Sequence, residues 1–77
     1  MAADLFLSKR NQITNFIKER KLVRTSDVIK FGLSIYTNRG DRYARDLAHE
    51  GLIKRLDDDR KILIFGNTRE DVWEWVG

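Results

Sequence analysis

Large apolar residues recur at helical spacing in the first part of the chain. They predict an amphipathic helix over residues 4–20, which Asp4 or Ser8 would cap at its start. The apolar stripe of this helix consists of Leu5, Phe6, Ile13, Phe16 and Ile17. A short apolar segment follows at residues 22–24, which is long enough for a strand of two or three residues.

A second, shorter helix is predicted directly after this strand. Thr25 or Ser26 would cap it, and Asp27 in its first turn suits the positive end of the helix dipole. Its expected core contacts are Val28, Ile29 and Phe31. Gly32 is expected to end it, because glycine adopts the left-handed conformation that often follows a helix at little cost.

A third helix is predicted over residues 37–50, opened by Thr37 or Asn38 and ended by Gly51. One face of this helix is small and apolar, so it can pack closely on another helix. That face consists of Gly40, Ala44, Leu47, Ala48 and Gly51. The opposite face carries Asn38, Arg39, Arg42, Asp46 and His49, with Tyr43 and Arg45 on its two flanks.

Two further apolar runs, residues 52–56 and 61–65, flank a polar segment of four residues. This pattern predicts a β-hairpin with Asp57, Asp58 and Asp59 at its tip. Adjacent side chains in a strand point to opposite sides, so the three carboxylates would not converge on a metal ion. We therefore expect a polar turn there and no metal site.

The C-terminal segment, residues 68–77, has two competing interpretations. Thr68 with Asp71 resembles a capping box and predicts a short last helix over residues 69–76. The alternation of Val72, Glu74 and Val76 instead favours a strand.

Composition limits the classes of function. The chain has 77 residues, 42% hydrophobic and 35% charged, as expected of one folded domain. It has no cysteine and a single histidine, His49, which excludes thiolate chemistry and any site with two imidazoles. We expect no cofactor, no small-molecule ligand, no membrane partner and a cytoplasmic location, or the host cytoplasm for a viral protein. The net charge of +3 is compatible with a polyanionic partner.

The order of these elements resembles the winged helix-turn-helix family of DNA-binding domains. The resemblance spans residues 8–66, and its sharpest part is the stretch Leu47-Ala48-His49-Glu50-Gly51-Leu52-Ile53, which looks like the family's passage from recognition helix into wing. It implies an α+β fold in a single domain over residues 1–77. That fold would have three helices, a two- or three-stranded β-wing and a short C-terminal helix. The helix-turn-helix would lie at about 26–50 and the wing at about 52–65.

The resemblance implies that helix 37–50 enters the major groove of double-stranded DNA. Its predicted length of about 20 Å fits that groove, and arginine can bind guanine through two hydrogen bonds. The bases would be contacted by Asn38, Arg39, Arg42 and Tyr43, with Arg45 on the flank. The phosphates would be contacted by Ser34, Tyr36, Thr37, Lys54, Arg60 and Lys61.

Each of these expectations has a simpler alternative. Arg42 and Asp46 are spaced as an i,i+4 ion pair, so the outer face of the third helix can equally be a solvated, salt-bridged surface. The acidic hairpin tip also departs from the family, whose wings usually present basic residues to DNA.

Terminal apolar residues point to a homodimer, with burial in the monomer core as the alternative. The expected interface consists of Phe6, Leu7, Trp73, Trp75 and Val76. A two-fold dimer would bind an inverted repeat.

The sequence thus predicts a sequence-specific DNA-binding protein, a small transcriptional regulator that represses by steric occlusion. The alternative is a winged helix that binds another protein and no DNA. An enzyme is not expected, because no nucleophile has an adjacent base and no glycine-rich phosphate loop occurs.

Overall fold

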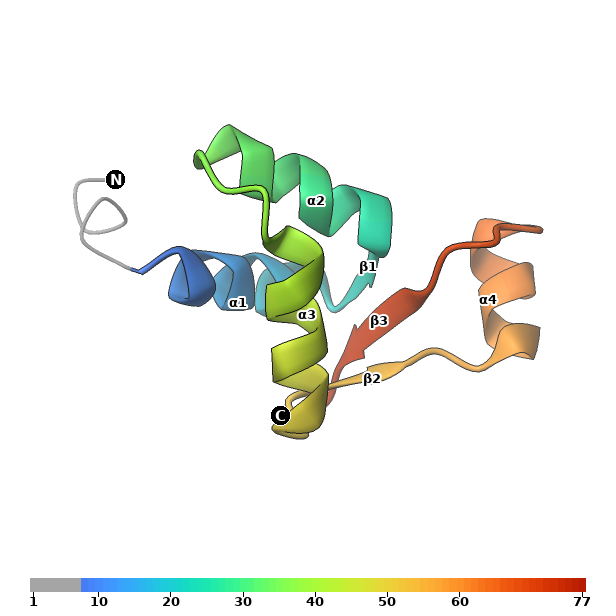
Figure 1. The fold of residues 1–77 in the computed structure, drawn as a ribbon. Coiled ribbons are helices and arrows are strands. Elements are labelled where there is room, and N and C mark those ends of the chain that lie inside the picture. Colours follow the sequence, from blue (N-terminus) through green and yellow to red (C-terminus); the bar gives the residue numbers. More distant parts are fainter. Residues whose placement is uncertain (1–7) are drawn as a thin grey trace.

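A computed structural model describes residues 8–77 as a small α+β protein with four helices and a three-stranded antiparallel sheet (Figure 1). The predicted α+β class is therefore confirmed. In chain order the elements are α1 (Lys9–Arg20), β1 (Leu22–Arg24), α2 (Thr25–Ser34), α3 (Gly40–His49), β2 (Ile53–Arg55), α4 (Asp58–Phe65) and β3 (Val72–Trp75).

The last strand, β3, is the centre of the sheet. It pairs antiparallel with β1 on one side and with β2 on the other, so the strand order is β1-β3-β2. Trp73 illustrates the register, because it lies opposite both Val23 and Arg55. The sheet consequently joins the beginning, the middle and the end of the described chain.

The core lies where α1, α2 and α3 pack on one another and on the sheet. The small apolar face predicted for α3 is largely confirmed: Gly40, Ala44 and Leu47 are buried and Ala48 is half-buried. The other residues of the core cluster are Ile13, Ile17, Val23, Val28 and Ile53. Leu56 and Val72 are also fully buried. Partly buried aromatic side chains, among them Phe16, Phe31 and Tyr43, pack against this cluster.

The first helix begins at one of its two predicted caps. The Ser8 hydroxyl accepts a hydrogen bond from the Asn11 backbone N–H at 3.1 Å, which satisfies one of the free donors of the first turn. The other predicted cap, Asp4, lies outside the described residues.

The start of α2 differs from the prediction that Thr25 or Ser26 caps it. Arg24 takes the cap position, and the Asp27 carboxylate accepts hydrogen bonds from the Arg24 backbone N–H at 3.2 Å and from its guanidinium at 3.0 and 3.1 Å. The hydrogen bond from the Arg24 side chain lowers the pKa of the Asp27 carboxyl and raises the pKa of Arg24. The Thr25 hydroxyl instead donates to the backbone carbonyl of Asp71 at 2.8 Å, so it joins α2 to the entry of β3.

Gly32 does not end α2 as predicted. It is buried inside the helix, which continues to Ser34, and Tyr36 adopts the left-handed conformation with a φ of 64°. Gly51 does adopt it, with a φ of 80°, directly after α3, as predicted from the sequence. The difference follows from packing, because Gly32 lies against Thr37 and Gly40 at the α2–α3 contact.

The predicted hairpin between residues 52–56 and 61–65 is wrong. The second of these runs belongs to α4, and β2 pairs with β3 instead. Asp57 is the N-cap residue of α4, and the carboxylates of Asp58 and Asp59 lie in its first turn, where they suit the positive end of the helix dipole. Short apolar runs fit a strand and a helix equally well, so the pattern alone did not separate them.

The predicted C-terminal helix over residues 69–76 is also wrong, and the competing interpretation as a strand is confirmed. Val72 is fully buried, and the backbone of this segment forms ladders with strands on both sides. A helix at this place would leave both β1 and β2 without a partner, which explains why the weak capping pattern of Thr68 does not prevail.

Candidate nucleic-acid interface

The position of α3 is set by a close approach to α2. A Cβ atom on Gly40 would lie 2.8 Å from the backbone carbonyl oxygen of Val28, so only glycine allows the two helices to meet here. The turn between them, residues 35–39, is closed by a 2.9 Å hydrogen bond from the Thr37 N–H to the Gly32 carbonyl. The Thr37 hydroxyl then accepts from the Arg39 N–H at 3.2 Å. This packing holds α3 with its apolar face inward.

The outer face of α3 gathers most of the residues predicted to read DNA bases. They line a shallow polar depression formed by Asn38, Arg39, Asp41, Arg42, Arg45, Asp46 and His49. Asn38, Arg39, Arg42 and Arg45 are all exposed. The helix is shorter than predicted: ten residues correspond to about 15 Å, and Asn38 and Arg39 precede its first turn.

The arginines of this face are not engaged in ion pairs. Among residues 8–77, no salt bridge involves Arg39, Arg42 or Arg45, and the i,i+4 pair between Arg42 and Asp46 is not formed. Glu50, at the end of the same helix, pairs with Arg10 of α1 instead. The three guanidinium groups therefore point their donors to solvent, where a phosphate or a base edge can accept them.

Residues of the preceding turn have mixed surroundings. Tyr36 is 92% exposed, and the Lys9 ammonium lies 5.8 Å from the centre of its ring. The Ser34 hydroxyl is exposed but donates to the Phe31 carbonyl at 2.6 Å. Tyr43 is half-buried and packs against the core, which fits its packing alternative better than a base contact.

The three predicted phosphate contacts of the wing all have protein partners. Arg60 and Lys54 share the carboxylate of Glu74, at 3.2 and 3.8 Å. Lys61 lies 3.8 Å from Asp58 and donates to the Glu70 carbonyl at 3.5 Å. The structure therefore does not leave these cations as free as the arginines of α3.

The residues predicted to form the dimer interface differ in their surroundings. Phe6 and Leu7 lie outside the described residues, and Val76 is half-exposed. Trp73 and Trp75 are partly buried and pack on the core of their own chain, with the Trp73 indole N–H donating to the Thr25 hydroxyl at 3.2 Å. Both rings thus contribute to the monomer, as the alternative interpretation expected.

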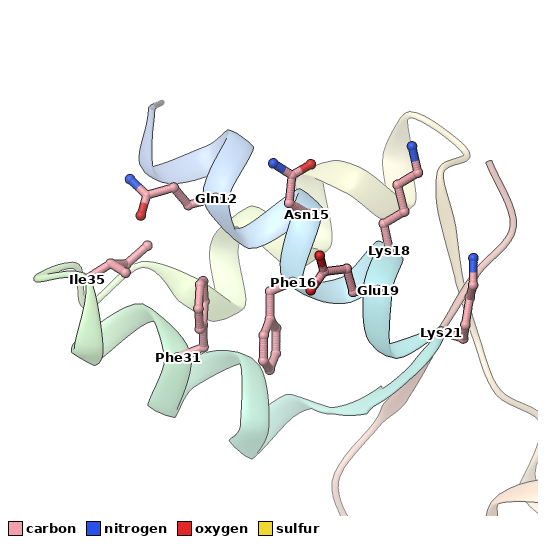
Figure 2. A pocket seen from close by; sticks show the side chains of 8 residues that line it. All are labelled: Gln12, Asn15, Phe16, Lys18, Glu19, Lys21, Phe31 and Ile35. Carbon is pink, nitrogen blue, oxygen red and sulfur yellow. The ribbon is translucent and has the colours of Figure 1, made fainter. Parts of the chain in front are cut away.

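A groove between α1 and α2 was not expected from the sequence (Figure 2). Its aromatic centre is the stacked pair Phe16 and Phe31, whose ring centroids are 4.3 Å apart, while Lys18 and Lys21 extend away from the rings. Gln12, Asn15, Glu19 and Ile35 complete the lining. The groove shares no lining residue with the depression on α3.

The sequence also missed the apolar surface of α4. Ile62, Leu63 and Ile64 are 53%, 85% and 50% exposed, and no residue of this helix is buried. The available signal was the series of acidic residues directly before an apolar run, which is typical of a helix start.

Residues 8–77 show no sign of two other kinds of site. In this part of the chain no three acidic, histidine or cysteine side chains are placed to hold a metal ion. None of its helices combines the length and the apolar composition that a membrane span requires. Comparisons of the chain with protein-family models, curated proteins and solved structures find no match.

Proposed function

We propose that this chain is a winged-helix domain that binds double-stranded DNA through α3 and acts as a small transcriptional regulator. The observation that carries the proposal is the set of arginines Arg39, Arg42 and Arg45, exposed on one helix face without a carboxylate partner. Unpaired guanidinium groups can donate to DNA phosphates or, through two hydrogen bonds, to the edge of a guanine.

The order of the elements supports the same proposal. A helix, a short strand, two further helices and two antiparallel strands follow one another as in the winged-helix family that the sequence resembles. Two features depart from that pattern. The turn between α2 and α3 spans residues 35–39, longer than predicted, and α4 occupies the place of a hairpin tip. We place the DNA contacts on α3 and its preceding turn, because the cations of the wing are already paired.

The test is binding to a fluorescent random-sequence duplex, followed by anisotropy from about 50 to 200 mM salt. Each phosphate contact adds about −0.9 to the slope of log affinity against log salt. The variant Arg39→Ala/Arg42→Ala should bind at least about tenfold more weakly, with a slope reduced by about 2 if both arginines contact phosphates. If the protein binds, a selection for preferred DNA sequences would then show whether α3 contacts the bases.

The matched control is Lys18→Ala/Lys21→Ala, which removes the same charge from the groove between α1 and α2. It should keep nearly the wild-type affinity, because only long-range attraction changes. Wild-type binding weaker than about 10⁻⁴ M at low salt would disprove the proposal. If both double variants lose the same DNA affinity, the protein is attracted to DNA by its net charge and not through contacts of α3.

The second candidate is a protein-binding winged helix, and the exposed apolar residues of α4 favour it. In that case the wild type binds no DNA in the same titration. Substitutions on α3 would then leave the binding of the protein partner unchanged. The two candidates are therefore separated by one experiment.

A further inference from the structure

The helix α4 stands apart from the rest of the protein. It lies at the far end of the β2–β3 ribbon in Figure 1, away from α1, α2 and α3. Among the described elements it shares no extensive contact with any other helix or strand. Its polar contacts with the rest of the protein include Arg60 with Glu74, Lys61 with the Glu70 carbonyl and Asp58 with Arg55.

The residues of α4 divide into an inner and an outer side. Lys61 and Phe65 are one turn apart and both half-buried, so they mark the side that faces the protein. At about 100° per residue, Leu63 lies on the opposite side, and Ile62 and Ile64 lie about 100° from it, one in each direction. We call these three residues the outer ridge. Three large apolar side chains, each half-exposed or more, are a surface that water disfavours and that a partner would cover.

Charges around the outer ridge indicate which partner fits. The start of α4 is acidic, and the side chains of Asp57 and Asp59 have no salt bridge among the described residues. Arg69, just beyond the end of α4, is exposed and likewise without a carboxylate partner in this part of the chain. Along the chain, unpaired negative groups therefore precede the apolar residues of α4 and an unpaired positive group follows them.

We propose that the outer ridge is a self-association surface, on which α4 of a second copy of this chain packs antiparallel about a two-fold axis. Antiparallel packing centred on Leu63 brings the acidic start of one helix to the end of the other, which Arg69 follows four residues later in the chain. A two-fold contact repeats this attraction twice, since the same patch serves both copies. A parallel pair would set the two acidic ends together and is disfavoured.

The size of the ridge limits the strength of the dimer. Eight residues of helix extend about 12 Å, whereas a standard stable interface buries about 800 Å² on each partner. One short helix supplies less than that, so the dimer is weak and depends on concentration. It also differs from the interface predicted from the sequence, because Trp73 and Trp75 are used in the core.

An alternative acceptor for the ridge exists on α2. Ile29 and Leu33, one turn apart on that helix, are both exposed. Packing α4 of one copy onto α2 of the next is a head-to-tail contact, which forms open chains unless it closes into a ring. The experiment below distinguishes this arrangement from the two-fold pair.

The test is sedimentation equilibrium of the intact chain without nucleic acid, from about 10 µM to 1 mM, with folding of each variant checked by circular dichroism. The wild type should show a monomer–dimer equilibrium. Leu63→Asp should weaken it at least about tenfold, because a charge replaces the centre of the contact. The matched control Leu33→Asp places the same change on α2, where the residue is also exposed, and should leave the dimer unchanged.

A charge exchange tests the antiparallel arrangement itself. Arg69→Glu alone and Asp57→Arg/Asp59→Arg alone should each weaken self-association, because like charges then meet at both ends. An equimolar mixture of these two variants should restore it, since both ends of the mixed dimer pair opposite charges. A wild type that is monomeric at about 1 mM overturns the proposal. So does loss of association in Leu33→Asp, or a mixture no tighter than its components.

Discussion

Gly40 shows how one residue without a side chain positions the candidate DNA-binding helix. Its Cα lies against the backbone of α2, where an added Cβ would approach the Val28 oxygen to 2.8 Å. Gly40→Ala should lower the free energy of unfolding by about 2 kcal/mol, although alanine has the higher helix propensity. Urea denaturation measures this change. Asp46→Ala, on the exposed face of the same helix, is the control and should change stability little; equal stability of Gly40→Ala and wild type would refute the close approach.

Asp27 links local hydrogen bonding to the pH dependence of stability. Its pKa is lowered in the folded protein, chiefly by the hydrogen bond from the Arg24 side chain, so the folded state favours the charged carboxylate. This stabilisation is complete above the ordinary carboxyl pKa and is lost as the pH falls through the lowered value. Asp27→Asn should therefore cost about 1 kcal/mol at pH 7 and progressively less below about pH 4. A loss that is independent of pH would contradict this assignment.

At the scale of elements, α4 is predicted to be dispensable for folding. None of its residues is buried, and the β2–β3 pairing that flanks it is antiparallel and in register. Replacing residues 58–66 by Asn-Gly leaves a short polar loop between β2 and β3, because residues 67–70 stay in the connection. This change should therefore keep the fold and reduce stability by less than about 2 kcal/mol. Thermal unfolding followed by circular dichroism measures the change. Complete loss of the cooperative transition would show that α4 is part of the core.

The elements near the N-terminal half were easier to predict than those near the end. The helices that became α1, α2 and α3 have apolar residues at helical spacing over several turns, and packing agreed with that pattern. Residues 61–65 form a single short apolar run, which has no such period to distinguish helix from strand. The strand at residues 72–75 pairs with residues about fifty positions away, such as Val23, so its local alternation favoured a strand but did not decide against the competing helix.

At the scale of the whole molecule, the two proposals use different surfaces and make separable predictions. The shortened chain that lacks residues 58–66 keeps the arginines of α3 but loses the outer ridge. It should bind a random duplex with nearly wild-type affinity in the anisotropy assay and remain monomeric in the ultracentrifuge. A parallel loss of DNA binding in a folded variant would show that the region of α4, and not α3 alone, supplies phosphate contacts.

By itself the sequence determined the α+β class, the helices around the core, the small inward face of α3 and the left-handed Gly51, because each depends on near neighbours in the chain. The exposed position of Arg42 on the outer face of α3 was also predictable from helical spacing, whereas Asn38 and Arg39 precede the helix. Only the tertiary structure decided which charges are paired. Glu50 pairs with Arg10 and Glu74 with Arg60, contacts between elements distant in sequence, whereas the arginines of α3 form no salt bridge among the described residues. The same holds for β3, whose conformation depends on pairing with β1 and β2, two strands distant in sequence.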